Sequence, residues 1–184
     1  MDSRPAVFLD RDGTLNVEVV RDGKPYPPDT LAGFRLHDGA AEACARLKAA
    51  GYVLVVATNQ PDVGRGKQER AVVEAMHARL RELIPSLDLV QVCCHGGAAH
   101  GQPCDCRKPA PGMLLDAAAR LGLDLTRSWM VGDRWGDIDA GHAAGCRTIF
   151  LDRGYTEALR TKPHFTARSL LDAAGMILAQ DAKA

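Results

Sequence analysis

Two carboxylates lie two residues apart near the start of the chain, directly after a short apolar run. Asp10 and Asp12 follow residues 6–9 in the sequence Phe-Leu-Asp-Arg-Asp-Gly-Thr. If the backbone stays extended, both side chains point the same way. Two carboxylates in one cleft repel each other, so the pair needs a cation, and one member tends to have a raised pKa. This suits a metal ligand and nucleophile beside a general acid, although Asp-Gly is also common in simple turns.

Three further polar segments occur near the ends of other predicted elements. Thr-Asn-Gln at 58–60 follows the second apolar run, Arg-Lys-Pro at 107–109 precedes a helical pattern, and Gly-Asp-Arg-Trp-Gly-Asp at 132–137 follows the fourth run. Each segment alone is ordinary, as a helix cap, a solvated face or a turn. Together, in this order, they favour a single site assembled from four parts of the chain.

The stretch at 93–106 holds four of the six cysteines and two histidines. A Cys-x-His pair and a Cys-x-Cys pair enclose a glycine-rich loop, and three thiolates with one imidazole suit a closed, structural zinc site. The predicted ligands are Cys93, His95, Cys104 and Cys106, with Cys94 and His100 open as replacements. Buried, reduced cysteines are the alternative, but this loop has few apolar side chains to pack. A zinc here would also hold the adjacent Arg-Lys pair in place.

Alternating elements must position these groups. Short apolar strands are predicted at 6–9, 52–57, 89–93, 129–131 and 147–151, and helical patterns at 40–47, 72–83, 112–121, 136–144 and 167–179. This order predicts an α/β fold with a doubly wound parallel sheet, because parallel neighbours need crossover connections. Ligands of such sheets bind at the carboxyl ends of the strands. The four polar segments fall where that rule places a site.

Size and composition limit the remaining possibilities. The 184 residues fit one domain, which we expect at 1–184 with a lid at about 11–38 and a zinc loop at about 93–106. Lysine plus arginine and aspartate plus glutamate each number 23, so no global field favours nucleic acid or a membrane. No apolar run approaches the roughly 20 residues of a membrane span. We expect a cytoplasmic monomer.

The four segments resemble the motifs of the haloacid dehalogenase (HAD) superfamily of phosphatases: Asp-x-Asp-Gly-Thr, a Ser or Thr, a Lys, and a Gly-Asp with a following Asp. They run from Asp10 to Asp137. The resemblance implies a Rossmann-like HAD fold without a large cap domain. It also implies that Asp10 attacks phosphorus to form an aspartyl phosphate, while Asp12 serves as acid and then base.

The remaining roles implied by this resemblance concern phosphate and metal. Thr58 holds phosphate oxygens, and Lys108 offsets the charge gathered at the nucleophile. Mg²⁺ is bound by Asp10, the backbone carbonyl of Asp12 and Asp133, with Asp137 acting from behind these ligands.

The zinc motif, together with Cys-x-Cys-Arg-Lys-Pro and a following Pro-Gly-Met, is similar to the D-glycero-D-manno-heptose 1,7-bisphosphate 7-phosphatase family. The similarity runs from Phe8 to about Gly145. It implies a hydrolase that removes the 7-phosphate of a sugar bisphosphate, in lipopolysaccharide or nucleotide-sugar biosynthesis. The substrate contacts that it implies are Asn59, Gln60, Arg65, Lys67, Arg107 and Arg134. The chain departs from the family at Pro61-Asp62, where Ser-Gly is usual, and in the proline-rich stretch 19–30.

Other functions remain open. A histidinol-phosphate phosphatase is similar, although the Arg-Gly-Lys and Pro-Gly-Met segments argue against it, and a longer sugar bisphosphate, such as an octose 1,8-bisphosphate, is a further candidate substrate. A phosphate-binding or scaffold protein would not benefit from the pair of carboxylates, and a phosphatase of nucleic-acid ends would need a basic groove. Magnesium-dependent phosphate release separates enzyme from binder.

Overall fold

A six-stranded parallel sheet forms the centre of the molecule. The computed structural model describes residues 3–181, so both ends of the predicted 1–184 domain lie outside the described residues. The sheet has the order β5-β4-β1-β6-β7-β8. Its strands are β1 (Ala6–Leu9), β4 (Val53–Asn59), β5 (Leu89–Cys93), β6 (Trp129–Gly132), β7 (Arg147–Leu151) and β8 (Phe165–Ala167).

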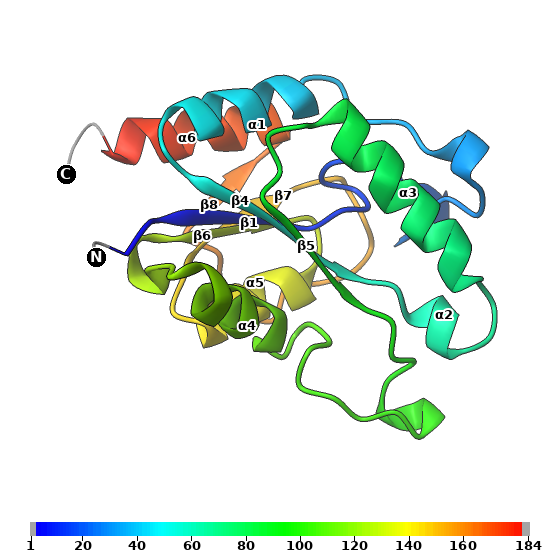
Figure 1. Ribbon diagram of the computed structural model, residues 1–184. Coiled ribbons are helices and arrows are strands. Elements are labelled where there is room, and N and C mark those ends of the chain that lie inside the picture. Colours follow the sequence, from blue (N-terminus) through cyan, green and yellow to red (C-terminus); the bar gives the residue numbers. More distant parts are fainter. Residues whose placement is uncertain (1–2, 182–184) are drawn as a thin grey trace.

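Helices cover both faces of this sheet (Figure 1). One face packs against α1 (Ala40–Ala49), α3 (Arg70–Leu83) and α6 (Leu170–Asp181), and the other against α4 (Gly112–Leu121) and α5 (Trp135–Ala143). Successive residues of β1 point to opposite faces: Val7 and Leu9 belong to the first core, and Ala6 and Phe8 to the second. Because the central strands are buried on both sides, they read as continuous apolar runs.

The connection between β1 and α1 contains a small hairpin. Its strands are β2 (Val19–Arg21) and β3 (Lys24–Tyr26), and the 3-10 helix η1 (Leu31–Gly33) follows. Asp22 and Gly23, with φ of 51° and 70°, form the two-residue turn, as right-handed strand twist favours. The stretch 11–38 thus contains regular structure, and its role as a lid stays a prediction.

Most predicted elements are confirmed. The bounds of β1, β5, β7 and α4 match, and the four buried positions of α1 are the predicted ones. Val73 rather than Val72 is buried on α3. The short helix α2 (Pro61–Gly64) and strand β8 were not predicted. Within the described part of the chain, no helix is both long and apolar enough to span a membrane.

Candidate active site

Three central strands bring the polar segments together at their carboxyl ends. β1 pairs in parallel with β4 on one side and β6 on the other. Asp10 directly follows β1, Thr58 and Asn59 end β4, and Asp133 directly follows β6. The strand-end rule thus places these residues at one edge of the sheet.

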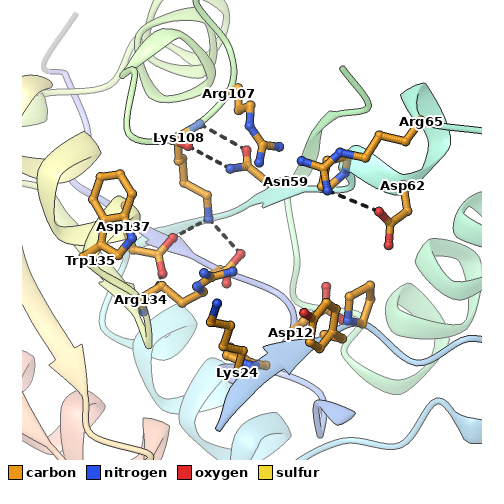
Figure 2. A pocket seen from close by; sticks show the side chains of 16 residues that line it. Asp12, Lys24, Asn59, Asp62, Arg65, Arg107, Lys108, Arg134, Trp135 and Asp137 are labelled. Atoms are coloured by element: carbon orange, nitrogen blue, oxygen red, sulfur yellow. Dashed lines mark hydrogen bonds and ion pairs between the residues drawn. The ribbon is translucent and has the colours of Figure 1, made fainter. Parts of the chain in front are cut away.

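Asp10 and Asp137 share one buried lysine. Lys108 Nζ lies 2.8 Å from Asp10 Oδ1 and 2.5 Å from Asp137 Oδ1, and Figure 2 shows it pointing at both carboxylates. Burial and the charge of Asp137 raise the pKa of Asp10 to about 6, against the opposing effect of Lys108. The two carboxylates in turn raise the pKa of Lys108 despite its burial, so the ammonium stays charged.

Asp133 is buried with unmet hydrogen-bonding capacity. Neither of its carboxylate oxygens has a hydrogen-bond partner among the described residues, and burial together with Asp10 raises its pKa. Gly13, at φ 85°, leaves room for this carboxylate, because a side-chain carbon there would collide with it. Oxygens of Asp10, Asp133 and Asp137 lie within 4.8 Å of one another. Such a cluster of hard oxygen donors fits Mg²⁺.

The Asp12 side chain lies outside this cluster and is held separately. Both of its oxygens accept hydrogen bonds from Arg11, at 2.9–3.2 Å. Asn16 Nδ2 donates to Oδ1 at 3.0 Å, and Gln60 Nε2 donates to Oδ2 at 2.7 Å. The carboxylate nevertheless lines the pocket, as that of Asp10 does. Asp10 therefore belongs to the buried cluster that could bind a metal, whereas the side chain of Asp12 is held by hydrogen bonds.

The Thr-Asn-Gln segment mainly supports other groups. Gln60 Nε2 also donates to Thr58 Oγ1 at 2.9 Å. Asn59 Nδ2 donates to the carbonyl oxygen of Lys108 at 2.9 Å, and its Oδ1 accepts from the Lys108 amide at 3.1 Å. The side-chain amide of Asn59 therefore fastens the Lys108 loop to the end of β4.

A pocket of about 310 Å³ opens over these carboxylates. Its walls include the hairpin residues Lys24 to Pro27, the start of α2, and Trp135. Five cations and four carboxylates line it (Lys24, Arg65, Arg107, Lys108, Arg134; Asp10, Asp12, Asp62, Asp137). In Figure 2 the arginines and Lys24 surround the opening from different elements.

The four predicted substrate cations have different positions. Arg65 donates to the Gly96 carbonyl at 3.3 and 3.4 Å, and Arg134 pairs with Glu157 at 2.6 Å. Arg107 has a buried Nη1 without a hydrogen-bond partner in the described part of the chain. Lys67 is exposed and is not among the residues that line the pocket.

The predicted zinc ligands also converge. The ligand atoms of Cys93, His95, Cys104 and Cys106 lie within 4.8 Å of one another. The Cys93 and Cys104 sulfurs are 3.7 Å apart, close to the edge of about 3.8 Å that Zn–S bonds of about 2.3 Å give in a tetrahedron. His95 Nδ1 lies 3.6 Å from Cys93 Sγ and 3.3 Å from Cys106 Sγ. Cys94 and His100 are not in this group.

Several residues at the site carry no sequence signal. Glu157, in the connection from β7 to β8, holds the guanidinium of Arg134 through two hydrogen bonds of 3.0 and 2.6 Å. His77 of α3 contacts Arg11. Neither residue belongs to a motif or follows a strand, so only the tertiary structure connects them to the site.

Several known proteins are similar to this chain in sequence. A family model described as HAD-hydrolase-like matches residues 105–173. The D-glycero-beta-D-manno-heptose-1,7-bisphosphate 7-phosphatase of Pseudomonas aeruginosa is 42% identical over 156 residues, covering 83% of each chain. That of Pasteurella multocida is 38% identical over 179 residues, covering 92% of this chain and 94% of the relative.

A solved structure agrees with these relatives. The D,D-heptose 1,7-bisphosphate phosphatase of B. bronchiseptica, complexed with magnesium and phosphate, aligns with a TM-score of 0.76 and 29% identity. The alignment covers 96% of this chain and 99% of the other.

Proposed function

The chain belongs to the family of D-glycero-beta-D-manno-heptose-1,7-bisphosphate 7-phosphatases, and we propose that it removes the 7-phosphate of that sugar bisphosphate. One observation carries the assignment of chemistry. Asp10, Lys108 and a buried carboxylate cluster meet below a pocket whose lining includes five cations.

Asp10 is the proposed nucleophile. Its carboxylate attacks the phosphorus, the P–O bond to carbon 7 of the sugar breaks, and a phosphoryl group remains on Asp10. A carboxylate and a phosphate dianion repel each other, so the attack needs nearby positive charge. Lys108 supplies part of that charge, at 2.8 Å from Asp10. Mg²⁺, when bound by Asp10, Asp133 and the Asp12 carbonyl, with Asp137 behind them, neutralises further charge on the phosphoryl oxygens.

Asp12 is the proposed acid and base. It gives a proton to the leaving sugar oxygen, and afterwards removes a proton from the water that attacks the aspartyl phosphate. Thr58 is proposed to hold a phosphate oxygen through its hydroxyl. Gln60 contacts both Asp12 and Thr58, at 2.7 and 2.9 Å, which supports a role in alignment rather than direct substrate contact.

The phosphate that is not cleaved needs its own partners. Arg65, Arg107, Arg134 and Lys24 line the pocket in addition to Lys108, and arginine suits phosphate because its planar donors bind two oxygens at once. These further cations favour a bisphosphate over histidinol phosphate, whose amine is itself cationic. The exposed position of Lys67 argues against direct contact with the sugar.

Zinc is the proposed structural ion of the 93–106 loop. Its four side-chain ligands would leave no open coordination position, so it would take no part in the reaction. Because Cys106 directly precedes Arg107, the ion would fix the loop that carries Arg107 and Lys108. A single-domain, cytoplasmic monomer remains our prediction, and sedimentation velocity tests its oligomeric state.

The deciding experiment is a comparison of kcat/KM for heptose 1,7-bisphosphate, an octose 1,8-bisphosphate, histidinol phosphate and nucleotides, with and without Mg²⁺. We expect the heptose compound to exceed histidinol phosphate by at least about 100-fold. Asp10→Asn should fold normally and release no phosphate. Equal rates across the panel, or an active Asp10→Asn variant, would refute the proposal.

A further inference from the structure

Arg11 is a buried cation between the two aspartates that carry the proposed chemistry. Its side chain has no exposed surface, and a guanidinium keeps its charge at every working pH. Such burial is costly unless the N–H groups find acceptors. Asp12 provides most of them: Nε lies 3.2 Å from both carboxylate oxygens, and Nη2 lies 2.9 Å from Oδ1.

The other end of the guanidinium meets His77 of α3, where Nη1 lies 3.1 Å from the ring Nε2. Because a guanidinium only donates, this ring nitrogen is the acceptor, and the proton of the neutral ring is on Nδ1. Burial and the charge of Arg11 lower the pKa of His77 to about 4. The ring therefore keeps its lone pair throughout the neutral range.

His77 completes the anchoring of Arg11. Among the hydrogen bonds of residues 3–181, it is the one acceptor of the Arg11 side chain other than Asp12. Without it, Nη1 would be a buried donor with no partner, and the guanidinium could turn about the bonds to Asp12. Asn16 and Gln60 each bond one oxygen of Asp12, whereas Arg11 spans both.

We propose that His77 is a positioning residue that acts through Arg11 to hold Asp12 at the leaving oxygen. This inference rests on the proposed function, because only a phosphatase that uses Asp12 for proton transfer needs such precision. Misplacement of a reacting group by about 1 Å can cost about 100-fold in rate. The chain therefore extends its catalytic machinery to a helix that contributes no residue to the pocket lining.

The test compares His77→Leu, which removes the acceptor, with His77→Gln, whose amide oxygen can take the place of Nε2. Both are assayed with heptose 1,7-bisphosphate and with 4-nitrophenyl phosphate, whose leaving group departs without a proton. For the sugar, we expect His77→Leu to lower kcat by about tenfold or more at nearly constant KM. Asp12 is also the proposed base of the second step, which is the same for both substrates, so the two are compared in the pre-steady-state rate of phosphoryl transfer to Asp10. In that step the loss for the aryl phosphate should be smaller, and His77→Gln should recover most of the sugar rate.

Arg79→Leu is the matched control, because Arg79 lies on the same helix, is exposed, and pairs only with Glu82 among the described residues. It should retain the normal kcat. If His77→Leu does not fold, His77→Asn replaces it, since the shorter amide does not reach Nη1. An unchanged kcat for the sugar, or equal losses for both substrates in the phosphoryl-transfer step, would overturn the role of His77. A parent enzyme inactive on both compounds would instead overturn the proposed function.

Discussion

Three buried carboxylates lie close together at the pocket, which two of them line, and a single lysine lies beside them. Asp10, Asp133 and Asp137 lie within 4.8 Å of one another, and Lys108 bonds two of them. Removing ions from water is costly when attraction does not compensate for it. A divalent cation bound by these carboxylates would offset their mutual repulsion.

Magnesium should stabilise the fold through this cluster. At a concentration about 100 times its Kd, a ligand of the folded state adds about 2.7 kcal/mol, which corresponds to roughly 5 to 10 °C in Tm for a chain of this size. Differential scanning fluorimetry should detect this shift in the parent and a much smaller one in Asp133→Asn. Asp116→Asn, exposed on α4, is the control and should respond like the parent. Equal shifts in all three proteins would contradict the assignment of Asp133.

His77 also predicts a pH dependence of stability. Its folded-state pKa of about 4 lies below the ordinary value of 6.5, so the unfolded chain binds more protons between these values, and His77 makes stability fall as pH drops from 6.5 toward 4. His77→Gln should remove this contribution, on the order of 2 kcal/mol. Urea unfolding at pH 7 and pH 4.5 measures it. Parallel pH profiles for the two proteins would show that His77 titrates normally.

At this scale the sequence predicts the residues that belong to motifs. Asp10, Asp133 and Lys108 could be named because their segments, taken together and in this order, resemble the motifs of the HAD superfamily, although each segment alone also fits a turn, a cap or a solvated face. Glu157 and His77 could not be named, because an acid in a loop and a histidine on a helix usually have no role beyond contact with solvent. Their partners, Arg134 and Arg11, are 23 and 66 positions away in the chain.

Among the elements, the zinc loop has the clearest mechanical consequence. It runs from the end of β5 to the residue before Arg107, and few apolar side chains support it. Gln102 holds part of it, because it bonds the Gly96 amide at 2.7 Å and the Gly64 carbonyl at 3.1 Å, and we expect the four ligands to fix the rest.

Cys104→Ser should lose the zinc that we expect at about one ion per chain, lower Tm, and raise KM for the bisphosphate because Arg107 loses its support. Cys94→Ser changes a neighbouring cysteine outside the cluster and should retain both zinc and KM. Elemental analysis, fluorimetry and kinetics give the three measurements. A zinc-free parent that is folded and active would remove the ion from the description.

The elements that the sequence missed are the short ones. β2, β3 and β8 have three residues each, and α2 has four, too few to express a hydrophobic period. Pro25 also lies inside β3, where it is tolerated because this two-stranded ribbon leaves an open edge. The long elements of the sheet and its helices were predictable because each buries a whole face.

Across the whole molecule, positive and negative charges balance, but charged side chains gather at the pocket. The net charge is zero, and five cations and four carboxylates line one pocket. Attraction of a bisphosphate must therefore be local, and salt should screen it over about 8 to 10 Å at 0.1 to 0.15 M ionic strength.

Two lysines test this distribution. Lys24→Gln removes a charge from the pocket wall and should raise KM for the bisphosphate severalfold while weakening its dependence on salt. Lys67→Gln removes an exposed charge outside the lining and should leave both quantities close to normal. Enzyme kinetics from 20 to 300 mM KCl compare them. A larger rise in KM for Lys67→Gln than for Lys24→Gln would indicate that Lys67 contacts the substrate.

Arg107 shows how such a pocket can refuse the wrong sugar. One of its N–H groups is buried and has no acceptor among residues 3–181, so a ligand that binds beside it must bring an oxygen of its own. A sugar that carries only the scissile phosphate would leave this N–H without an acceptor, at a cost of about 1 to 3 kcal/mol in binding free energy. Discrimination against sugar monophosphates would then come from a buried hydrogen-bond donor that they leave unsatisfied, and not from a steric clash.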